Sequence, residues 1–172
     1  EGGITFAGMD IGRVHDATAL VVVRQDGKRF AVRFVSAVVG QDFEEQEAFA
    51  ADAVERGGVR RLAVDATSIG RHTAETLVKR LRGKVLPVHF GSENKQHMAG
   101  EMRRALQDGN LALPLHRGLL DALRAVRRET TPAGRLRLDA PRDGNGHADL
   151  FWALALALHA AGGGRQVSAV RL

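Results

Sequence analysis

The sequence has 172 residues, most simply one domain that buries about two-thirds of the surface its unfolded chain exposes. It contains no cysteine, which excludes a disulfide framework, a zinc site with thiolate ligands and a cysteine nucleophile. No apolar run reaches the roughly 18 residues of a membrane span. The net charge is +5, and arginines dominate the 25 basic residues, which favours a polyanionic partner. A GC-rich genome would also produce this arginine excess, so charge alone does not decide the function.

The first third of the chain predicts three antiparallel strands. Apolar runs over residues 3–10 and 17–25 are followed by an alternating run over 29–39, which is typical of a strand with one solvated face. Asp26 and Gly27 lie between the second and third runs, and this dipeptide is a strong signal for a tight hairpin.

The remaining two-thirds alternate between helices and short strands. Helices are predicted in FEEQEAFAADAVERGG and over residues 70–82, 93–108, 116–128 and 147–161. Short strands are predicted in VRRLAVDATS, KVLPVHF and LALP, and a small hairpin or loop in TTPAGRLRLDAPRDGNG. Thr67 and Ser68 are placed to cap the helix that follows them. Crossover helices imply parallel pairing of the later strands with the first one. We therefore predict a mixed, three-layer α/β domain over residues 1–161, with a flexible tail over 162–172.

Three aspartates occupy positions that such a sheet would bring together. Asp10 ends the first strand, and Asp65 ends the fourth. If these strands are parallel neighbours, both carboxylates emerge at the edge where open α/β sheets bind ligands. Asp149 lies in the first turn of the last helix, which is apolar nearly all round and so packs in a fixed place. Each aspartate alone could simply cap a turn or a helix, so the prediction depends on their joint placement.

Three carboxylates at one spot repel one another, and a divalent cation would relieve that repulsion. Oxygen ligands without cysteine or a paired-histidine motif favour Mg²⁺ or Mn²⁺, and two such ions can hydrolyse a phosphodiester. We therefore predict metal-binding and catalytic roles for Asp10, Asp65 and Asp149. Asp139 and Asp143 lie close to Asp149 in sequence, and either could replace or join it.

The motifs FAGMDIGRVHDATALVVV, LAVDATSIG and GHADLFWALALAL, in this order, resemble the C-terminal nuclease domain of phage large terminase subunits, including those of Mu-like phages. The segment KQHMAGEMRRALQDGNLALP is similar to that family as well. The resemblance implies an RNase H-like fold and an endonuclease that cuts concatemeric double-stranded DNA during genome packaging. It also implies that Asp16 is an auxiliary metal ligand, and that His147 orients water or contacts phosphate.

The same resemblance implies partners and a cellular place. The full protein of the family joins the nuclease to an ATPase motor, and acts with small terminase and portal proteins in the host cytoplasm. No Walker A motif occurs in this sequence, so the motor is not expected here. The isolated domain is expected to be a monomer with no membrane association. A Holliday-junction resolvase and a non-catalytic DNA-binding module of the same fold are the alternatives.

The arginines near the last helix are the predicted contacts to the DNA backbone, which would give sequence-independent and salt-sensitive affinity. They are Arg124, Arg127, Arg128, Arg135, Arg137 and Arg142. Aromatic residues are few, which makes stacking on single-stranded bases improbable, and Trp152 is predicted to lie in the core. The other histidines are expected at the surface or in the core, because they show no metal-ligand spacing. They are His15, His72, His89, His97, His116 and His159.

Overall fold

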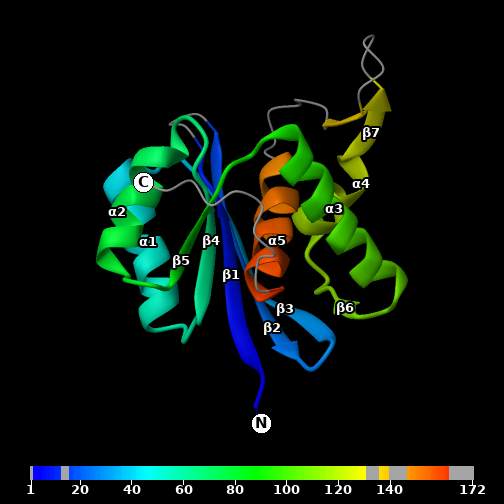
Figure 1. Ribbon diagram of the computed structural model, residues 1–172, viewed down its shortest axis with the longest axis horizontal. Helices are drawn as coiled ribbons and strands as arrows, with labels where there is room; N and C mark the ends of the chain where they lie inside the picture. Colours follow the sequence, from blue (N-terminus) through cyan, green and yellow to red (C-terminus); the bar gives the residue numbers. More distant parts are fainter. Residues whose placement is uncertain (1, 13–15, 131–135, 140–146, 163–172) are drawn as a thin grey trace.

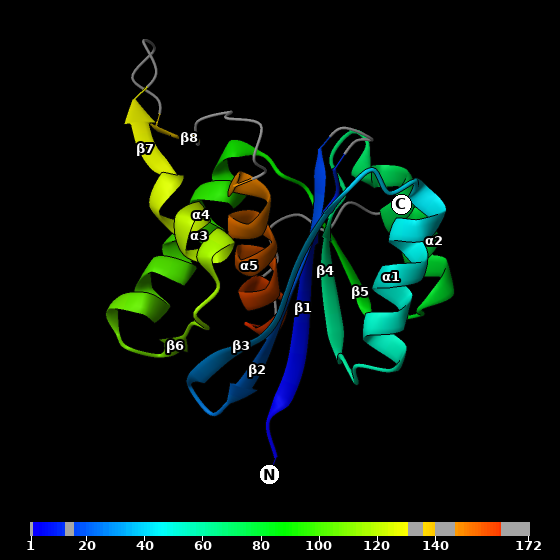
Figure 2. The same cartoon turned by 180° about the vertical axis from the view of Figure 1, so that it is seen from behind.

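The computed structural model describes residues 2–12, 16–130, 136–139 and 147–162. A six-stranded mixed sheet forms the centre, with the strand order β5-β4-β1-β2-β3-β6 (Figures 1 and 2). Its strands are β1 (Ile4–Asp10), β2 (Ala17–Asp26), β3 (Arg29–Val39), β4 (Arg61–Asp65), β5 (Val85–Val88) and β6 (Leu111–Ala112). A separate two-stranded sheet pairs β7 (Arg127–Thr130) with β8 (Leu136–Asp139).

Strand directions follow the predicted pattern. β1, β2 and β3 are antiparallel neighbours, and the hairpin between β2 and β3 turns at Gly27, which has a φ of 58°. β4 pairs in parallel with β1, β5 pairs in parallel with β4, and β6 pairs in parallel with β3. The predicted mixed sheet, antiparallel first and parallel later, is therefore confirmed.

Helices cover both faces of the sheet (Figures 1 and 2). They are α1 (Phe43–Glu55) and α2 (Gly70–Arg80) on one face, and α3 (Ser92–Gln107), α4 (Arg117–Ala125) and α5 (His147–Ala161) on the other. Alternate β1 side chains enter the two resulting cores: Ala7 and Met9 pack with the α1 and α2 side, and Phe6 packs with the α5 side. Asp10 has the parity of Phe6, so its side chain belongs to the α5 face of the sheet.

α5 is the central helix of the larger core. Apart from its two ends, nearly all of its residues are buried, which explains why its sequence is apolar all round. It packs closely on β1, where Gly8 leaves no room for a side chain because the α5 backbone lies against it. This close contact fixes the start of α5 relative to the end of β1.

One predicted helix ends earlier than expected. The pattern predicted a helix over 116–128, but α4 ends at Ala125, and Val126 is already extended with a ψ of 118°. Arg127 then pairs with Asp139 as β7 joins β8. The hairpin alternative for the segment after α4 is thus confirmed, and strand pairing has replaced the last turn of the expected helix.

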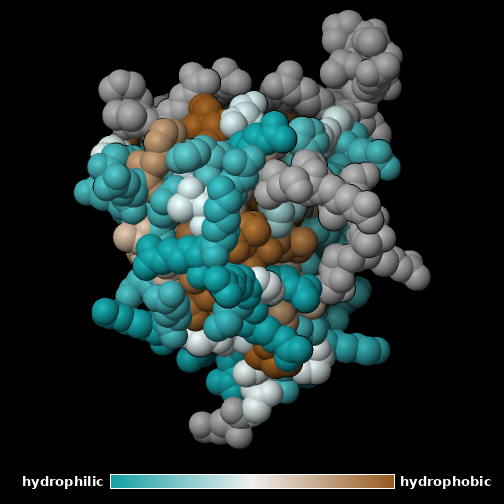
Figure 3. Space-filling view, turned by 60° about the vertical axis from the view of Figure 1, so that its left-hand side comes forward, coloured by the Kyte–Doolittle hydropathy of each residue, from teal (hydrophilic) through white to brown (hydrophobic). Residues whose placement is uncertain are grey.

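Within the described part of the chain, no helix is both long and apolar enough to cross a membrane. The face seen in Figure 3 is mostly hydrophilic, and hydrophobic groups reach the surface in smaller areas between the polar side chains. The predicted tail from residue 163 onward lies outside the described residues.

Candidate active site

Asp10 and Asp65 lie at the ends of neighbouring parallel strands. Met9 pairs with Val64, so the aspartate that follows each of them leaves the sheet at the same edge. α5 begins at this edge as well (Figure 1), and it carries Asp149 in its first turn. The carboxylates of Asp65 and Asp149 are close enough to raise the pKa of Asp10 by charge repulsion. We refer to Asp10, Asp65 and Asp149 as the three-acid site.

The three-acid site has an excess of negative charge. Burial, followed by repulsion from Asp149 and Asp65, raises the pKa of Asp10 well above its ordinary value. Burial also raises the pKa of Asp65. The pKa of Asp149 rises to about 6, first through burial and then through repulsion from Asp16. Each group is therefore destabilised as a bare carboxylate, which is the state that a bound divalent cation would stabilise.

Asp65 is held by the turn between β4 and α2. The backbone N–H of Thr67 donates to Asp65 Oδ1 at 2.8 Å, and Thr67 Oγ1 accepts from the N–H of Phe90 at 2.7 Å. Ser68 has a φ of 50°, an uncommon backbone conformation for a residue other than glycine. These hydrogen bonds tie the ends of β4 and β5 together and orient the carboxylate.

The predicted helix cap at this turn is wrong. Ile69 is the N-cap residue of α2, and no side chain makes a capping hydrogen bond there. Thr67 has its hydroxyl engaged with Phe90 instead, because β5 ends beside the turn. Thr67, which sequence alone would assign to the helix, therefore holds the Asp65 carboxylate instead.

Asp16 lies at the far end of the loop after β1. Gly12, which follows β1, is held by two hydrogen bonds: its N–H donates to Thr18 Oγ1 at 3.1 Å, and its carbonyl accepts from Gln46 Nε2 at 3.3 Å. Asp16 is exposed, and its negative charge contributes to the raised pKa of Asp149. The structure thus brings Asp16 near the carboxylate that it was predicted to assist.

Lys95 is a neighbour of the site that sequence reasoning missed. Its positive charge lowers the pKa of both Asp10 and Asp65, against the effect of burial. Its Nζ lies 5.0 Å from the ring centre of Phe90 and 4.9 Å from that of Trp152, which is buried as predicted. The available signal was its place in the first turn and a half of α3, because a helix that follows a parallel strand begins at the sheet edge where ligands bind.

The structure describes the other predicted site residues only in part. Arg124 and Arg127 are exposed, and Arg124 pairs loosely with Asp121 at 3.7 Å. His147 begins α5, Arg128 lies on β7, and Arg137 and Asp139 lie on β8, with their side chains outside the described part. Arg135, Arg142 and Asp143 lie wholly outside the described residues.

The fold is similar to several solved nucleases. It matches the large terminase nuclease of thermophilic phage G20c with bound magnesium, with a TM-score of 0.77 and 24% identity over 90% of this chain and 80% of that one. The nuclease domain of the Thermus phage P74-26 large terminase gives 0.73 and 23%, over 90% and 78%. A mutant nuclease domain of the large terminase subunit of bacterial virus Sf6, with manganese and beta-thujaplicinol, gives 0.65 and 15%, over 91% and 88%.

Among curated proteins, none matches the chain. The family model described as the terminase RNase H-like domain matches residues 7–161, from within β1 to the end of α5, and this span includes all three acids of the site. The protein therefore belongs to the family of terminase RNase H-like domains.

Proposed function

We propose that this protein is a metal-dependent DNA endonuclease that cuts concatemeric phage DNA during genome packaging. The observation that carries the proposal is the three-acid site, where three carboxylates with raised pKa values share one edge of the sheet. Relatives of this fold have been solved with magnesium and with manganese, which supports a divalent cation here. Membership of the terminase family favours this role over a Holliday-junction resolvase.

Asp10, Asp65 and Asp149 are the proposed metal ligands, with Asp16 as an auxiliary ligand. Their donor atoms are all carboxylate oxygens, a set that suits Mg²⁺ or Mn²⁺. When bound, a pair of such cations activates a water molecule and stabilises the leaving oxygen of a phosphodiester. The repulsion that raises the pKa of Asp10 supports this assignment, because Lys95 alone cannot neutralise three carboxylates.

The residues of the chain have separate tasks in this proposal. The Thr67 N–H holds the Asp65 carboxylate in one orientation. Lys95, whose ammonium group lies over the neighbouring rings of Phe90 and Trp152, supplies positive charge next to the site where a DNA phosphate would enter. His147, at the start of α5, orients water or contacts phosphate. An ATPase motor domain, small terminase and portal proteins are the proposed partners, in the host cytoplasm.

Cleavage of supercoiled plasmid tests the function. The protein is expected to nick and linearise plasmid with Mn²⁺ or Mg²⁺ but not with EDTA, and Asp65→Asn is expected to lower the rate about 100-fold or more. The matched control is Asp52→Asn, which removes an exposed acid that pairs with Arg56 on α1 and should leave the rate unchanged. Equal cleavage by the Asp65→Asn variant would contradict the three-acid site. Salt-sensitive DNA binding without any cleavage would instead favour the non-catalytic module.

Arg124 and Arg127 test the proposed DNA surface. Both are exposed: Arg124 lies in the last turn of α4, and Arg127 is the first residue of β7 in the hairpin that precedes α5 in the chain. In an Asp65→Asn background, Arg124→Ala with Arg127→Ala is expected to weaken duplex binding uniformly across sequences. The slope of log affinity against log salt should fall by about 1–2, which a fluorescence-anisotropy titration at several salt concentrations measures.

The control for this surface is Arg80→Ala with Arg82→Ala. These two exposed arginines lie at the end of α2, and α2 runs away from the site, so the pair makes the same change of net charge elsewhere. An equal loss of affinity in both double variants would mean that net charge alone drives binding, and it would contradict a DNA surface next to α5.

A further inference from the structure

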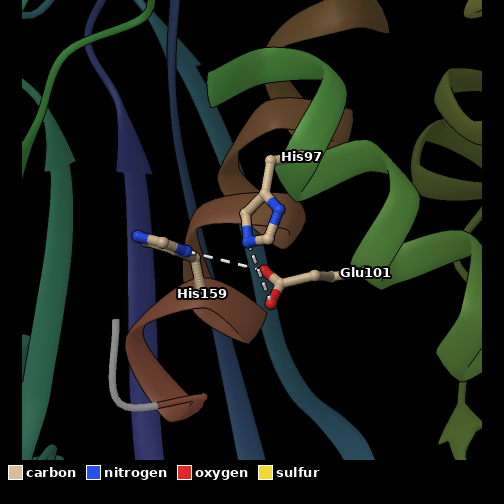
Figure 4. A group of neighbouring side chains, drawn as sticks. All are labelled: His97, Glu101 and His159. Carbon is tan, nitrogen blue, oxygen red and sulfur yellow. Dashed lines mark ion pairs between the residues drawn. The ribbon is translucent and has the colours of Figure 1, made fainter. Parts of the chain in front are cut away.

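Two histidines and a glutamate meet between α3 and α5 (Figure 4). His97 and Glu101 are one turn apart on α3, and His159 lies near the end of α5. His97 Nε2 is 3.3 Å from Glu101 Oε1, and His159 Nδ1 is 3.5 Å from Glu101 Oε2. We call these three residues the His–Glu cluster. Sequence spacing gave no indication of this group, because His159 lies far along the chain from His97 and Glu101.

Within the described structure, one buried polar atom of the His–Glu cluster has no hydrogen-bond partner. The His159 side chain is only 10% exposed. Glu101 Oε2 is buried and has no hydrogen-bond partner among the described residues, and its 3.5 Å contact with His159 exceeds the usual N–H···O range. Buried polar atoms of this kind need an explanation, and a missing ligand is one of the common ones.

The donor set is that of a zinc site. Two imidazoles and one carboxylate are a recurrent set of three protein ligands for Zn²⁺, with water in the fourth position. Zn–N and Zn–O bonds of about 2.0–2.2 Å place tetrahedral ligand atoms about 3.3–3.5 Å apart. Each histidine nitrogen lies at this separation from one oxygen of Glu101, His97 Nε2 from Oε1 and His159 Nδ1 from Oε2. One ligand atom from each of the three residues lies within 4.8 Å of the other two. The His97 side chain is 40% exposed, so an ion can enter from solvent.

We propose that His97, Glu101 and His159 form a second metal site, which binds Zn²⁺ or a similar transition-metal ion and clamps α3 to α5. The site is separate from the three-acid site, because His159 follows Asp149 by ten residues, or about 15 Å along the helix. Its nitrogen ligands also select different ions from an all-carboxylate site. The clamp joins the helix that carries Lys95 to the helix that carries Asp149, and it does not depend on the proposed nuclease activity.

Cobalt spectroscopy distinguishes the two sites. Co²⁺ in a tetrahedral site with nitrogen ligands absorbs visible light strongly, whereas Co²⁺ among six oxygen ligands absorbs weakly. In the Asp65→Asn variant, in which the three-acid site is impaired, we expect a strong visible band with one Co²⁺ per chain that one equivalent of Zn²⁺ removes. Zn²⁺ is also expected to raise the melting temperature of this variant.

Changes within the cluster provide the decisive comparison. Adding His97→Ala to the Asp65→Asn variant should abolish the band, and adding Glu101→Gln should weaken Zn²⁺ binding about 100-fold or more. His97 is partly exposed, so its loss should not prevent folding, as a change at buried His159 could. His72→Ala, which removes an exposed histidine on α2, is the control and should keep the band. Without a band, or with one that persists after His97→Ala, the cluster is only an ion-pair network and the proposal fails.

Discussion

The Asp10→Asn variant is expected to be more stable than the parent protein in EDTA and inactive in the presence of metal. Its melting temperature in EDTA at neutral pH should rise by about 2–4 °C, which corresponds to about 1 kcal/mol for a chain of this size. Its rate of plasmid cleavage should fall about 100-fold or more. Saturating Mn²⁺ should raise the melting temperature of the parent protein more than that of the variant.

The gain in stability follows from the electrostatics of the site. The ordinary pKa of an aspartate is 3.8, and in the folded protein that of Asp10 lies well above this value. Between these two pKa values the folded state binds more protons than the unfolded state, so the free energy of unfolding decreases as pH rises through this window. The asparagine side chain carries no charge, so the free energy of unfolding of the variant lacks this decrease with pH. The difference should therefore vanish below about pH 3, where Asp10 is protonated in both states.

Thermal melts at a series of pH values, with EDTA and with Mn²⁺, measure this effect. Asp52→Asn is the control, because it removes an exposed carboxylate whose ion pair with Arg56 contributes little to stability. A variant that is less stable than the parent protein in EDTA would mean that Asp10 makes a favourable structural interaction. That result would contradict the proposed repulsion within the three-acid site.

The Gly8→Ala variant is expected to have a much lower free energy of unfolding than the parent protein. A Cβ atom at this position would clash with the Ala153 carbonyl oxygen and the Ala157 nitrogen. Both atoms belong to the backbone of α5, which is buried and cannot move aside without repacking the core. Overpacking of this kind costs about 1–3 kcal/mol and occasionally more, and we expect the upper end of that range. Displacement of α5 would also move Asp149, so cleavage should fall as well.

Urea unfolding of Gly8→Ala and Gly100→Ala provides a matched pair. Gly100 lies inside α3, and a Cβ atom there would meet no neighbouring atom within 4 Å, so alanine should stabilise the helix by up to about 1 kcal/mol. Opposite signs in the two variants would support close packing of β1 against α5. Equal stability of Gly8→Ala and the parent protein would show that the two elements do not approach as closely as described.

The local elements of this protein could be predicted from its sequence. The hairpin at Gly27 and the last helix, from His147 to Ala161, have the predicted bounds or lie within a residue of them. Turn residues and apolar periodicity are local signals, and the partners that satisfy them lie within a few positions in the chain. Asp10 and Asp65 could be placed at one sheet edge for the same reason, since each ends a strand.

Contacts between distant segments were decided only by the tertiary structure. Thr67 accepts from Phe90 instead of capping α2, and the end of the predicted helix 116–128 became a strand because β8 was available as a partner. Lys95 lies near the three-acid site, and His159 contacts Glu101, only because α3 and α5 pack against each other. Periodicity in a sequence indicates which face of a helix is buried, but it does not indicate which other element packs against that face, because that element can lie far along the chain. The packing of the whole domain therefore determined which side chains became neighbours.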